Sequence, residues 1–327
     1  MWKALAAPSL RWVYCIDLGI PGAPLAGLRR RLSRHARLIY EIGDPAKPLL
    51  ANQRRPKAEV VLASAMDRHL PAFADRLVFR GSYLAEYFKA LVGEGSMPTW
   101  DWVPDGVDTG LFRPLRQEAS VAALRRKHRL ENCFVVGLVG NIHHNRLHNL
   151  FYGWELVEAL SILRPELPII GVVVGDGPGV GVLESTARAL GVADRLRLVG
   201  RVRHSDVPLW MNVFDVALST QTDDPVGWGR TTAKLPEYLA CGTPVICTDV
   251  GEAHRLLKES GQTLRYRGMR DGVYPQRLAA RIQELLETDL DVLRKTNREL
   301  ALRLFDYRVL RRQMHMILTK ATTEPKT

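Results

Sequence analysis

The sequence predicts an α/β protein built on parallel β-sheets, and three observations lead to this prediction. Short apolar segments rich in Val, Ile and Leu recur along the 327 residues. Strands of this character are buried on both faces, as they are in parallel sheets covered by helices. Segments with helical spacing of apolar residues alternate with these strands, and glycine and proline mark many of the transitions.

The expected strands form two groups separated by a polar stretch. Four lie in the first part of the chain, at 12–16, 38–42, 76–79 and 100–103. Six lie in the second part, at 133–139, 169–174, 196–199, 216–219, 245–248 and 263–266. Helices are expected between them at 82–91, 147–163, 182–189, 206–213 and 275–287. In the last of these, Leu278, Ile282 and Leu285 share one helical face.

The polar stretch 114–126 predicts a domain boundary. We expect an N-terminal Rossmann-like domain at 1–116, a C-terminal one at 117–298 and a final segment at 299–327. The N-terminal domain holds only four expected strands, whereas a doubly wound sheet usually has its first strand at the centre. This domain is therefore expected either to be a reduced version of the fold or to lack an N-terminal portion.

The chain is basic, with a net charge of +11, and residues 1–60 contain 11 Lys/Arg but only 4 Asp/Glu. The densest basic run is 28–38, where a helix would place Leu28, Leu32 and Ala36 on one face. This pattern predicts either a peripheral contact with an anionic membrane surface or a solvated helix. Nucleic acid is not an expected partner, because the basic residues are not interleaved with aromatic ones.

Cysteine usage and hydropathy indicate a compartment. The four cysteines are scattered without metal-type spacing, and no apolar stretch is long enough to span a bilayer. No signal-peptide pattern precedes Arg11. We therefore expect a cytoplasmic protein, with or without peripheral attachment to the inner face of a membrane.

The most informative stretch is 234–248. It predicts a short helix that stops at Gly242 and is followed by an apolar strand. A helix start gathers free backbone N–H groups, which with Lys234 would form an anion site. Glu237, about a turn further on, could bind a sugar diol, so that the two features together would form a nucleotide site. The alternative is a capped helix with a surface glutamate. The helix start is expected among Arg230, Thr231 and Thr232.

Glycines and polar residues also follow other strands of the second group. Gly140 closes the strand 133–139 and precedes Asn141, Arg146 and three histidines. A guanidinium such as that of Arg146 matches diphosphate oxygens, whereas zinc binding by the histidines is the weaker alternative because no Cys or carboxylate stands nearby. Gly175 opens a Gly-Asp-Gly-Pro turn that either admits a ligand or simply reverses the chain.

Several aspartates have a structural and a functional interpretation. Asp44 follows the strand 38–42 and either faces a cleft or starts an Asp-Pro turn. Asp223 and Asp224 are better interpreted as turn residues than as ligands of substrate hydroxyls. Asp289 and Asp291 form an Asp-x-Asp pair, which we interpret as capping of the next helix rather than as a metal site.

The order of these motifs resembles one family, the group 1 (family-four, retaining) glycosyltransferases of GT-B fold. The resemblance runs from about residue 70 to the end, and it is specific because the motifs occur in the family's order. It implies two Rossmann-like domains with parallel sheets that face a cleft, the N-terminal one shortened, and a final helix that returns to the N-terminal domain. The matching segments are 74–84, 103–112, 139–140, 174–178, 198–202, 214–219, 234–245 and 305–307.

The function that this resemblance implies is transfer of a sugar, with retention, from a UDP- or GDP-sugar to an acceptor glycan, lipid or small molecule. Glu237 is similar to the second acidic residue of the family's Glu-x7-Glu motif, which binds the donor ribose. Lys234 is similar to the lysine of a Lys-x-x-Glu variant, and the amides of 231–233 would hold the diphosphate. No metal or other cofactor is expected. The implied catalytic residues are Asp44, Arg146 and Lys234, and the implied donor-binding residues are Gly140, Asn141, Gly175, Arg201, Thr231, Thr232 and Glu237.

Three positions depart from the family's pattern. Gly229 stands where the family has the first acidic residue of its Glu-x7-Glu motif, and Asn141 stands where the family usually has an arginine. Gly43 and Asp44 stand where the family commonly has a His-Asp pair. These departures leave two alternatives to an active transferase. One is a non-catalytic GT-B-like protein that binds a nucleotide or a glycan beside a partner. The other is a GT-B-type sugar-nucleotide epimerase, which the motif order fits less well.

Overall fold

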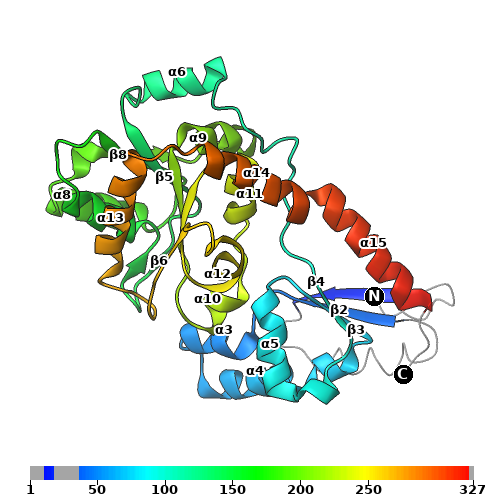
Figure 1. The fold of residues 1–327 in the computed structure, drawn as a ribbon. Helices are drawn as coiled ribbons and strands as arrows, with labels where there is room; N and C mark the ends of the chain where they lie inside the picture. Colours follow the sequence, from blue (N-terminus) through cyan, green and yellow to red (C-terminus); the bar gives the residue numbers. More distant parts are fainter. Residues whose placement is uncertain (1–10, 18–36, 324–327) are drawn as a thin grey trace. The chain divides into compact units, whose positions relative to one another are not determined.

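The computed structural model describes residues 11–17 and 37–323, which form two compact units (Figure 1). Unit 1 contains the chain up to Asp105, the segment Asp224–Thr231 and the chain from Arg308 onward. Unit 2 contains Gly106–Asp223 and Thr232–Tyr307. The basic run 28–38 lies outside the described residues except for its last two, so the membrane contact expected for it stays a prediction.

Unit 1 is built on a parallel sheet of four strands in the order β1-β2-β3-β4. Because β1 lies at the edge of this sheet and not at its centre, Trp12 and Ile16 are 37% and 58% exposed. The strands are β1 Trp12–Ile16, β2 Arg37–Ile42, β3 Arg76–Phe79 and β4 Trp100–Trp102.

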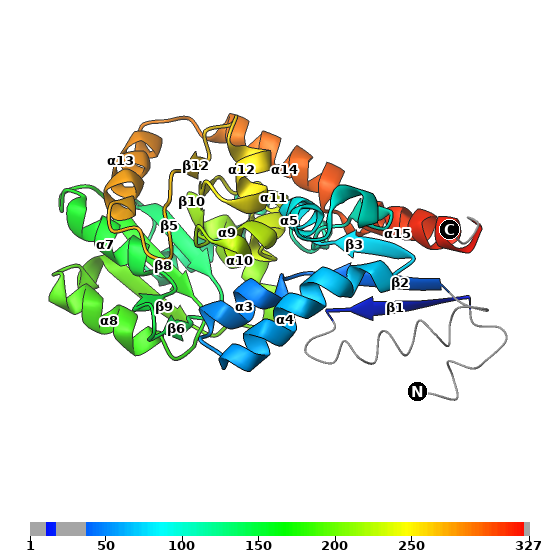
Figure 2. The same cartoon turned by 90° about the horizontal axis from the view of Figure 1, so that it is seen from below.

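Helices cover both faces of this sheet. One face packs on α4 and α5 through a cluster that includes Tyr40, Met66 and Phe88. The other face packs on α15, where Ile317 contacts Ile39 and Val78, and Figure 2 shows this red helix alongside the strands. The helices of the unit are α3 Ala46–Asn52, α4 Lys57–His69, α5 Ser82–Val92, α10 Pro225–Gly229 and α15 Tyr307–Thr323, with 3₁₀ turns at Pro71–Phe73 and Glu94–Ser96.

Unit 2 is built on a parallel sheet of six strands in the order β12-β11-β10-β5-β8-β9. The strand order reverses between β5 and β10, so the sheet is doubly wound and has its topological switch point there. The strands are β5 Phe134–Val139, β8 Ile169–Val174, β9 Leu196–Gly200, β10 Val216–Ser219, β11 Val245–Thr248 and β12 Thr263–Leu264. A two-stranded hairpin, β6 His144–Asn145 and β7 Leu150–Phe151, follows β5.

Two hydrophobic clusters fill the two faces of this sheet. One joins it to α7, α8 and α13, and the other joins it to α6, α9, α11, α12 and α14 (Figure 1). Both faces are covered, which explains why the strands are apolar without alternation. The helices are α6 Ala119–Lys127, α7 Trp154–Ile162, α8 Val180–Ala189, α9 Val207–Val213, α11 Lys234–Ala240, α12 Gly251–Leu257, α13 Tyr274–Leu286 and α14 Asp291–Leu304, with 3₁₀ turns at Ala193–Arg195 and His204–Asp206.

The boundaries between the units differ from the predicted ones. The sequence predicts 116/117, but the chain enters unit 2 at Gly106 because Val107, Phe112 and Leu115 are buried in that unit's core. Near the other end, the predicted final segment 299–327 contains parts of two helices. The end of α14 packs in unit 2, and α15 belongs to unit 1 from Arg308 onward.

Two predicted helices have the wrong starting point. The helix expected at 147–163 begins only at Trp154, because the hairpin of β6 and β7 takes up the preceding residues. Gly153, with a φ of 92°, ends the hairpin and opens the helix. The helix expected to begin among residues 230–232 begins at Lys234, because residues 225–229 form the separate helix α10 of unit 1.

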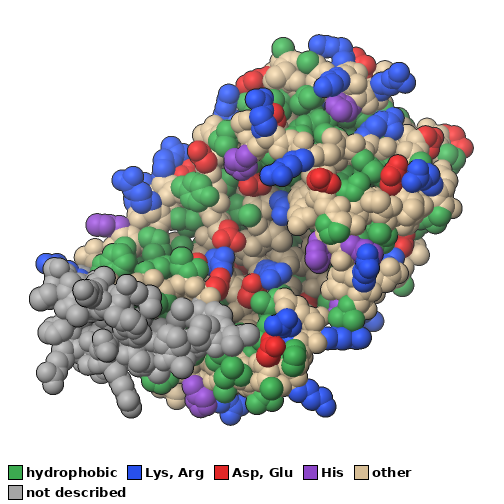
Figure 3. Space-filling view, turned by 180° about the vertical axis from the view of Figure 1, so that it is seen from behind, with side chains coloured by type: hydrophobic (Ala, Val, Ile, Leu, Met, Phe, Trp, Pro, Cys, Tyr) green, Lys and Arg blue, Asp and Glu red, His purple; other side chains and the backbone are tan. Residues whose placement is uncertain are grey.

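Over the part of the face in Figure 3 that is not drawn in grey, basic and acidic side chains of the described residues are interspersed and form no single continuous basic patch. Within residues 11–17 and 37–323, no helix has the length and hydropathy needed to cross a membrane.

A buried amide network joins α14 to the loops around β11. Asn297 is fully buried, and its Nδ2 donates to the carbonyl of Thr243 at 3.0 Å and to Oε1 of Gln262 at 2.9 Å. Gln262 donates in return to Oδ1 of Asn297 at 2.8 Å. A buried polar group that loses its hydrogen-bond partner destabilises the fold, because it has given up its bonds to water without gaining others.

We therefore expect Asn297→Ala to lower the free energy of unfolding by about 2 kcal/mol, since the truncation removes the hydrogen-bond donor to the Thr243 carbonyl and two hydrogen bonds of the Gln262 side chain, which keeps those with Ser260 and Val245. Urea unfolding followed by circular dichroism measures this change. Lys295→Ala, an exposed change on the same helix, is the control and should stay within about 0.5 kcal/mol of wild type. Equal midpoints for the two variants would contradict the structural role of the network.

Candidate functional site

A pocket of about 500 Å³ lies in unit 2 where β5, β8 and β9 end. It includes four of the residues selected from the sequence, namely Gly140, Asn141, Gly175 and Arg201. Ligands of doubly wound folds bind at the carboxyl ends of the strands, close to the switch point. The remaining lining residues are Val139, Val174, Asp176, Gly177, Val202 and Val207.

The loops that follow β5 and β8 interlock at this pocket. Ile142 N–H donates to the carbonyl of Asp176 at 2.9 Å, and Gly179 N–H donates to the carbonyl of Ile142 at 2.8 Å. A Cβ on Gly175 would collide with the carbonyl oxygen of Gly140, and one on Gly177 with the side chain of Asn141. These glycines are therefore required for packing of one loop on the other, which is the turn interpretation of the Gly-Asp-Gly-Pro motif.

Helix α11 brings Lys234 to the end of β5. A Cβ placed on Gly140 would lie 2.7 Å from Cε of Lys234 and 3.3 Å from its Nζ. The helix is held there by Tyr238, which is fully buried and whose hydroxyl accepts the N–H of Val139 at 2.8 Å. The ammonium group of Lys234 thus lies beside Gly140, a residue of the pocket lining.

The end of α11 agrees with the sequence prediction. Gly242 has a φ of 70°, its N–H donates to Leu239, and the N–H of Thr243 donates to Tyr238. This is the Schellman pattern, in which glycine adopts the left-handed conformation just after the helix. The following residues enter β11, as expected.

Thr231 and Thr232 lie in different units. Thr232 Oγ1 is 3.2 Å from Oγ of Ser219 at the end of β10, in unit 2, whereas Thr231 belongs to unit 1, where its hydroxyl donates to the carbonyl of Arg80. Leu235 N–H donates to Thr232 and Pro236 has no N–H. The amides that can face a ligand at this end of α11 are therefore those before Leu235.

Arg146 lies in the turn between β6 and β7, with an exposed side chain outside the lining of the pocket. The neighbouring histidines belong to the same hairpin, where His144 makes an edge contact with Phe151. Among the described residues, no group of three His, Cys, Asp or Glu side chains is placed to hold a metal ion.

Asp44 lies in unit 1, where Arg230 binds its carboxylate with two hydrogen bonds of 2.5 and 3.0 Å. Asp224 caps α10 through the amides of Val226 and Gly227, which agrees with its interpretation as a turn residue. Asp289 accepts the N–H of Asp291, the first residue of α14, which agrees with capping.

Residues 133–288 match the model of a protein family described as glycosyl transferases group 1. These residues are a group 1 glycosyltransferase domain. They make up most of unit 2 and include the pocket, Lys234 and Glu237.

Curated relatives match parts of the chain. The 2-deoxystreptamine glucosyltransferase of Streptomyces kanamyceticus is 33% identical over 158 residues, which are 46% of this chain and 37% of that protein. The D-inositol 3-phosphate glycosyltransferase of Paenarthrobacter aurescens is 24% identical over 276 residues, 81% of this chain and 59% of that protein. The chain therefore spans between about a third and three fifths of the length of these two relatives.

Solved structures share the fold over nearly the whole chain. HepE of Anabaena, in complex with UDP, has a TM-score of 0.73 at 19% identity and matches 95% of this chain and 79% of HepE. WaaG, a glycosyltransferase involved in lipopolysaccharide biosynthesis, has a TM-score of 0.59 at 18% identity, over 89% of this chain and 81% of WaaG. The fold is therefore the GT-B-like fold of these glycosyltransferases.

Sequence reasoning missed several residues at the pocket of the glycosyltransferase domain. Tyr152, at the end of the hairpin, lies against Gly140 beside Lys234, and burial raises the pKa of its hydroxyl. Val202 and Val207 provide an apolar wall. Tyr152 falls where the sequence predicted the interior of a helix, so its position could not be inferred.

Glu237 lies on α11 one turn after Lys234 and is partly buried. Burial raises the pKa of its carboxyl from 4.5 to about 7, and the Lys234 ammonium opposes this shift. The folded protein therefore retains a proton that the unfolded chain releases between pH 4.5 and 7. Stability from this group is present below pH 4.5 and is lost as the pH rises through 7.

We therefore expect Glu237→Gln to become more stable relative to wild type as the pH rises from about 5 to about 8, because glutamine has no proton to lose. Urea unfolding at four pH values across this range measures the difference. The exposed change Glu287→Gln is the control. If the Glu237→Gln difference does not change with pH, the carboxyl is not held in a desolvated site.

Proposed function

We propose that the chain transfers a sugar from a nucleotide-sugar donor to an acceptor and that the donor binds in the pocket of unit 2. The observation that carries this proposal is the position of Lys234 against Gly140 at the end of β5. An ammonium group at this point can donate hydrogen bonds to a diphosphate, and such charge-assisted bonds are the strong ones. Membership of the matched domain in the group 1 family supports the reaction class.

Each part of a nucleotide-sugar has a matching part of the site. The apolar wall of Val202 and Val207 suits the base, and the cations of Lys234 and Arg201 suit the diphosphate. Glu237, one turn along α11, would accept hydrogen bonds from the ribose hydroxyls. HepE has been solved in complex with UDP and with UDP-glucose, and this supports UDP as the nucleotide.

We propose that the reaction needs no metal ion, because Lys234 and Arg201 supply the positive charge that a leaving diphosphate requires. In the proposed step, the bond from the anomeric carbon to the diphosphate oxygen breaks as the acceptor oxygen bonds to that carbon. The acceptor's proton passes to the leaving diphosphate, and the anomeric configuration is retained. Lys234 would stabilise the charge that develops on the leaving group, which is the usual largest contribution to catalysis.

The acceptor is proposed to be a ring polyol. The relatives are named for action on 2-deoxystreptamine and on D-inositol 3-phosphate, which are substituted six-membered rings. Roles for Asp44 and Arg146 in catalysis stay predictions. Asp44 lines a pocket of unit 1, whereas Arg146 lies outside the lining of the pocket of unit 2.

One observation favours a second candidate function, a GT-B-like protein that binds the donor without transferring the sugar. Gly229 stands where the family has its first acidic residue, and a Cβ there would lie 2.8 Å from Cδ2 of Leu84. A carboxylate side chain therefore does not fit this position without rearrangement. UDP release from UDP-glucose, in the presence of candidate acceptors, separates the two functions, because a binding protein releases none.

The first test is thermal stability in the presence of UDP-, GDP- and ADP-sugars, with and without EDTA. A ligand at 100 times its Kd stabilises a protein by about 2.7 kcal/mol, so UDP-sugars should raise the unfolding temperature most, and EDTA should not change the effect. Absence of any shift across the panel would overturn the donor-site proposal.

The second test compares two lysines. Lys234→Ala should weaken UDP binding about 10- to 100-fold, since hydrogen bonds to charged groups contribute about 1.5–3 kcal/mol. Lys258→Ala removes an exposed lysine just after α12 and should leave the Kd unchanged. Isothermal titration calorimetry measures both, and equal affinities would remove Lys234 from the site.

A further inference from the structure

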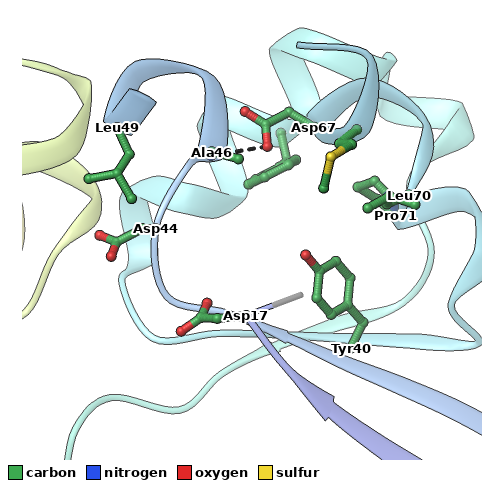
Figure 4. Close-up of a pocket in the computed structure, with 10 residues that line it drawn as sticks. Asp17, Tyr40, Asp44, Ala46, Leu49, Asp67, Leu70 and Pro71 are labelled. Carbon is green, nitrogen blue, oxygen red and sulfur yellow. Dashed lines mark hydrogen bonds between the residues drawn. The ribbon is translucent and has the colours of Figure 1, made fainter. Parts of the chain in front are cut away.

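A second pocket, of about 180 Å³, lies wholly within unit 1 (Figure 4). Strand β2 contributes Tyr40 to it, α4 contributes Met66 and Asp67, and the loops that follow β1 and β2 contribute Asp17 and Asp44. For comparison, an engineered apolar cavity of about 150 Å³ binds benzene. The pocket is therefore large enough for one six-membered ring.

Tyr40 presents an unused polar group to this pocket. The residue is only 7% exposed, and its hydroxyl points into the cavity (Figure 4). Among the described residues, the hydroxyl has no hydrogen-bond partner, although its ring packs in the core beneath. Buried polar groups almost always have a partner, so a group that enters the pocket from outside is expected to provide one.

Asp67 is the most buried carboxylate of the pocket, at 6% exposed. It accepts hydrogen bonds from the backbone N–H groups of Ala46 and Lys47 at 3.1 and 2.9 Å. No basic side chain forms an ion pair with it in the part of the chain that the structure describes. Burial raises the pKa of Asp67, and the shift is opposed by the hydrogen bonds from Lys47, Ala46 and Tyr87 and by the charge of Lys47.

The other two carboxylates already have cationic partners. Asp44 is bound by Arg230, and Asp17 forms an ion pair with Arg80 and accepts the N–H of Gly43. Each carboxylate still has lone pairs that can accept further hydrogen bonds. The polar side of the pocket therefore accepts hydrogen bonds and repels anions, while Met66 and Leu70 provide an apolar wall.

We propose that this pocket binds the ring of the acceptor, and that the ring has hydroxyl or ammonium donors but no phosphate or carboxylate. This inference rests on the proposed transfer reaction and narrows its acceptor class. The ring's hydroxyl or ammonium groups donate to Asp67 and to the oxygen of Tyr40, and its apolar face packs on Met66 and Leu70. An anionic substituent placed here would face a buried carboxylate, which is a repulsive contact that rejects the wrong substrate.

The test measures binding of a panel of six-membered rings to the full chain, by ligand-observed NMR in the presence of saturating UDP. The panel contains neutral polyols such as myo-inositol, amine-bearing rings such as glucosamine, and the phosphorylated form of each. We expect at least one neutral or amine-bearing ring to bind at least about 10-fold more tightly than its phosphorylated form. Tighter binding of the phosphorylated rings, or no binding by any ring, would overturn the inference.

Variants assign the binding to this pocket. Tyr40→Phe removes only the hydroxyl and should weaken ring binding about 10-fold without changing UDP binding, whereas Tyr83→Phe, at a 39% exposed residue of the same unit, should change neither. Asp67→Asn removes the charge and should reduce the discrimination against phosphorylated rings. If Asp67→Asn does not fold, Tyr40→Phe alone decides, and unchanged ring binding in that variant overturns the inference. If the wild-type protein does not bind UDP, that result would instead refute the donor-site proposal.

Discussion

The position of α11 against β5 determines the site in unit 2. The contact depends on Tyr238, which has no exposed surface and gives the N–H of Val139 a hydrogen-bond acceptor at the very end of the strand. Lys234 precedes Tyr238 by one turn, so the same contact that completes the strand's hydrogen bonding also brings an ammonium group to Gly140. The Schellman ending at Gly242 then turns the chain directly into β11. A displacement of this helix would therefore move both Lys234 and Glu237.

The glycines around the pocket are required for packing of the loops, whether or not they also contact a ligand. Gly175 and Gly177 allow the loop after β8 to lie directly on the loop after β5, where side chains would collide with Gly140 and Asn141. A consequence is that the backbone around the pocket is fixed by hydrogen bonds between the loops. Such a preorganised surface is what a site needs when its charged groups act on a developing charge. The glycine pattern is thus connected with the proposed nucleotide site, because it fixes the backbone around the pocket.

Much of the fold could be predicted from the sequence, because apolar β-branched runs and helix-stop glycines act locally. The six strands of unit 2 and the end of α11 at Gly242 follow from such patterns. The hairpin of β6 and β7 could not be predicted, because its apolar residues also fit a helix and only the left-handed Gly153 separates the two elements. The assignment of residues 224–231 to unit 1 depends on contacts distant in sequence, such as Tyr83 with Trp228.

The residues of the candidate pockets can likewise be divided into those that the sequence could predict and those that it could not. Gly140, Asn141, Gly175 and Arg201 come together because they follow neighbouring parallel strands, a relation that the sequence pattern contains. Tyr40 could not be selected, since it lies within an apolar strand and nothing local shows that its hydroxyl lacks a partner. Asp67 did leave a signal, because it lies on the buried face of α4 with Ala63 and Met66.

The two pockets differ in the sign of their charge, and this difference has a physical consequence for substrate choice. The pocket of unit 2 has Arg201 and Asp176 in its lining and Lys234 beside it, so that two cations and one carboxylate are present and an anionic ligand is favoured. The pocket of unit 1 is lined by three aspartates, of which Asp67 forms no ion pair within the described chain, and we expect it to disfavour an anionic ligand. A nucleotide-sugar carries its negative charge on the diphosphate, so the proposed donor would be attracted to the pocket of unit 2 and repelled by the pocket of unit 1. In the proposed reaction, the same contrast would keep both the UDP-sugar donor and the UDP product out of the pocket of unit 1. That pocket would then stay available to an acceptor that has only hydroxyl or ammonium groups.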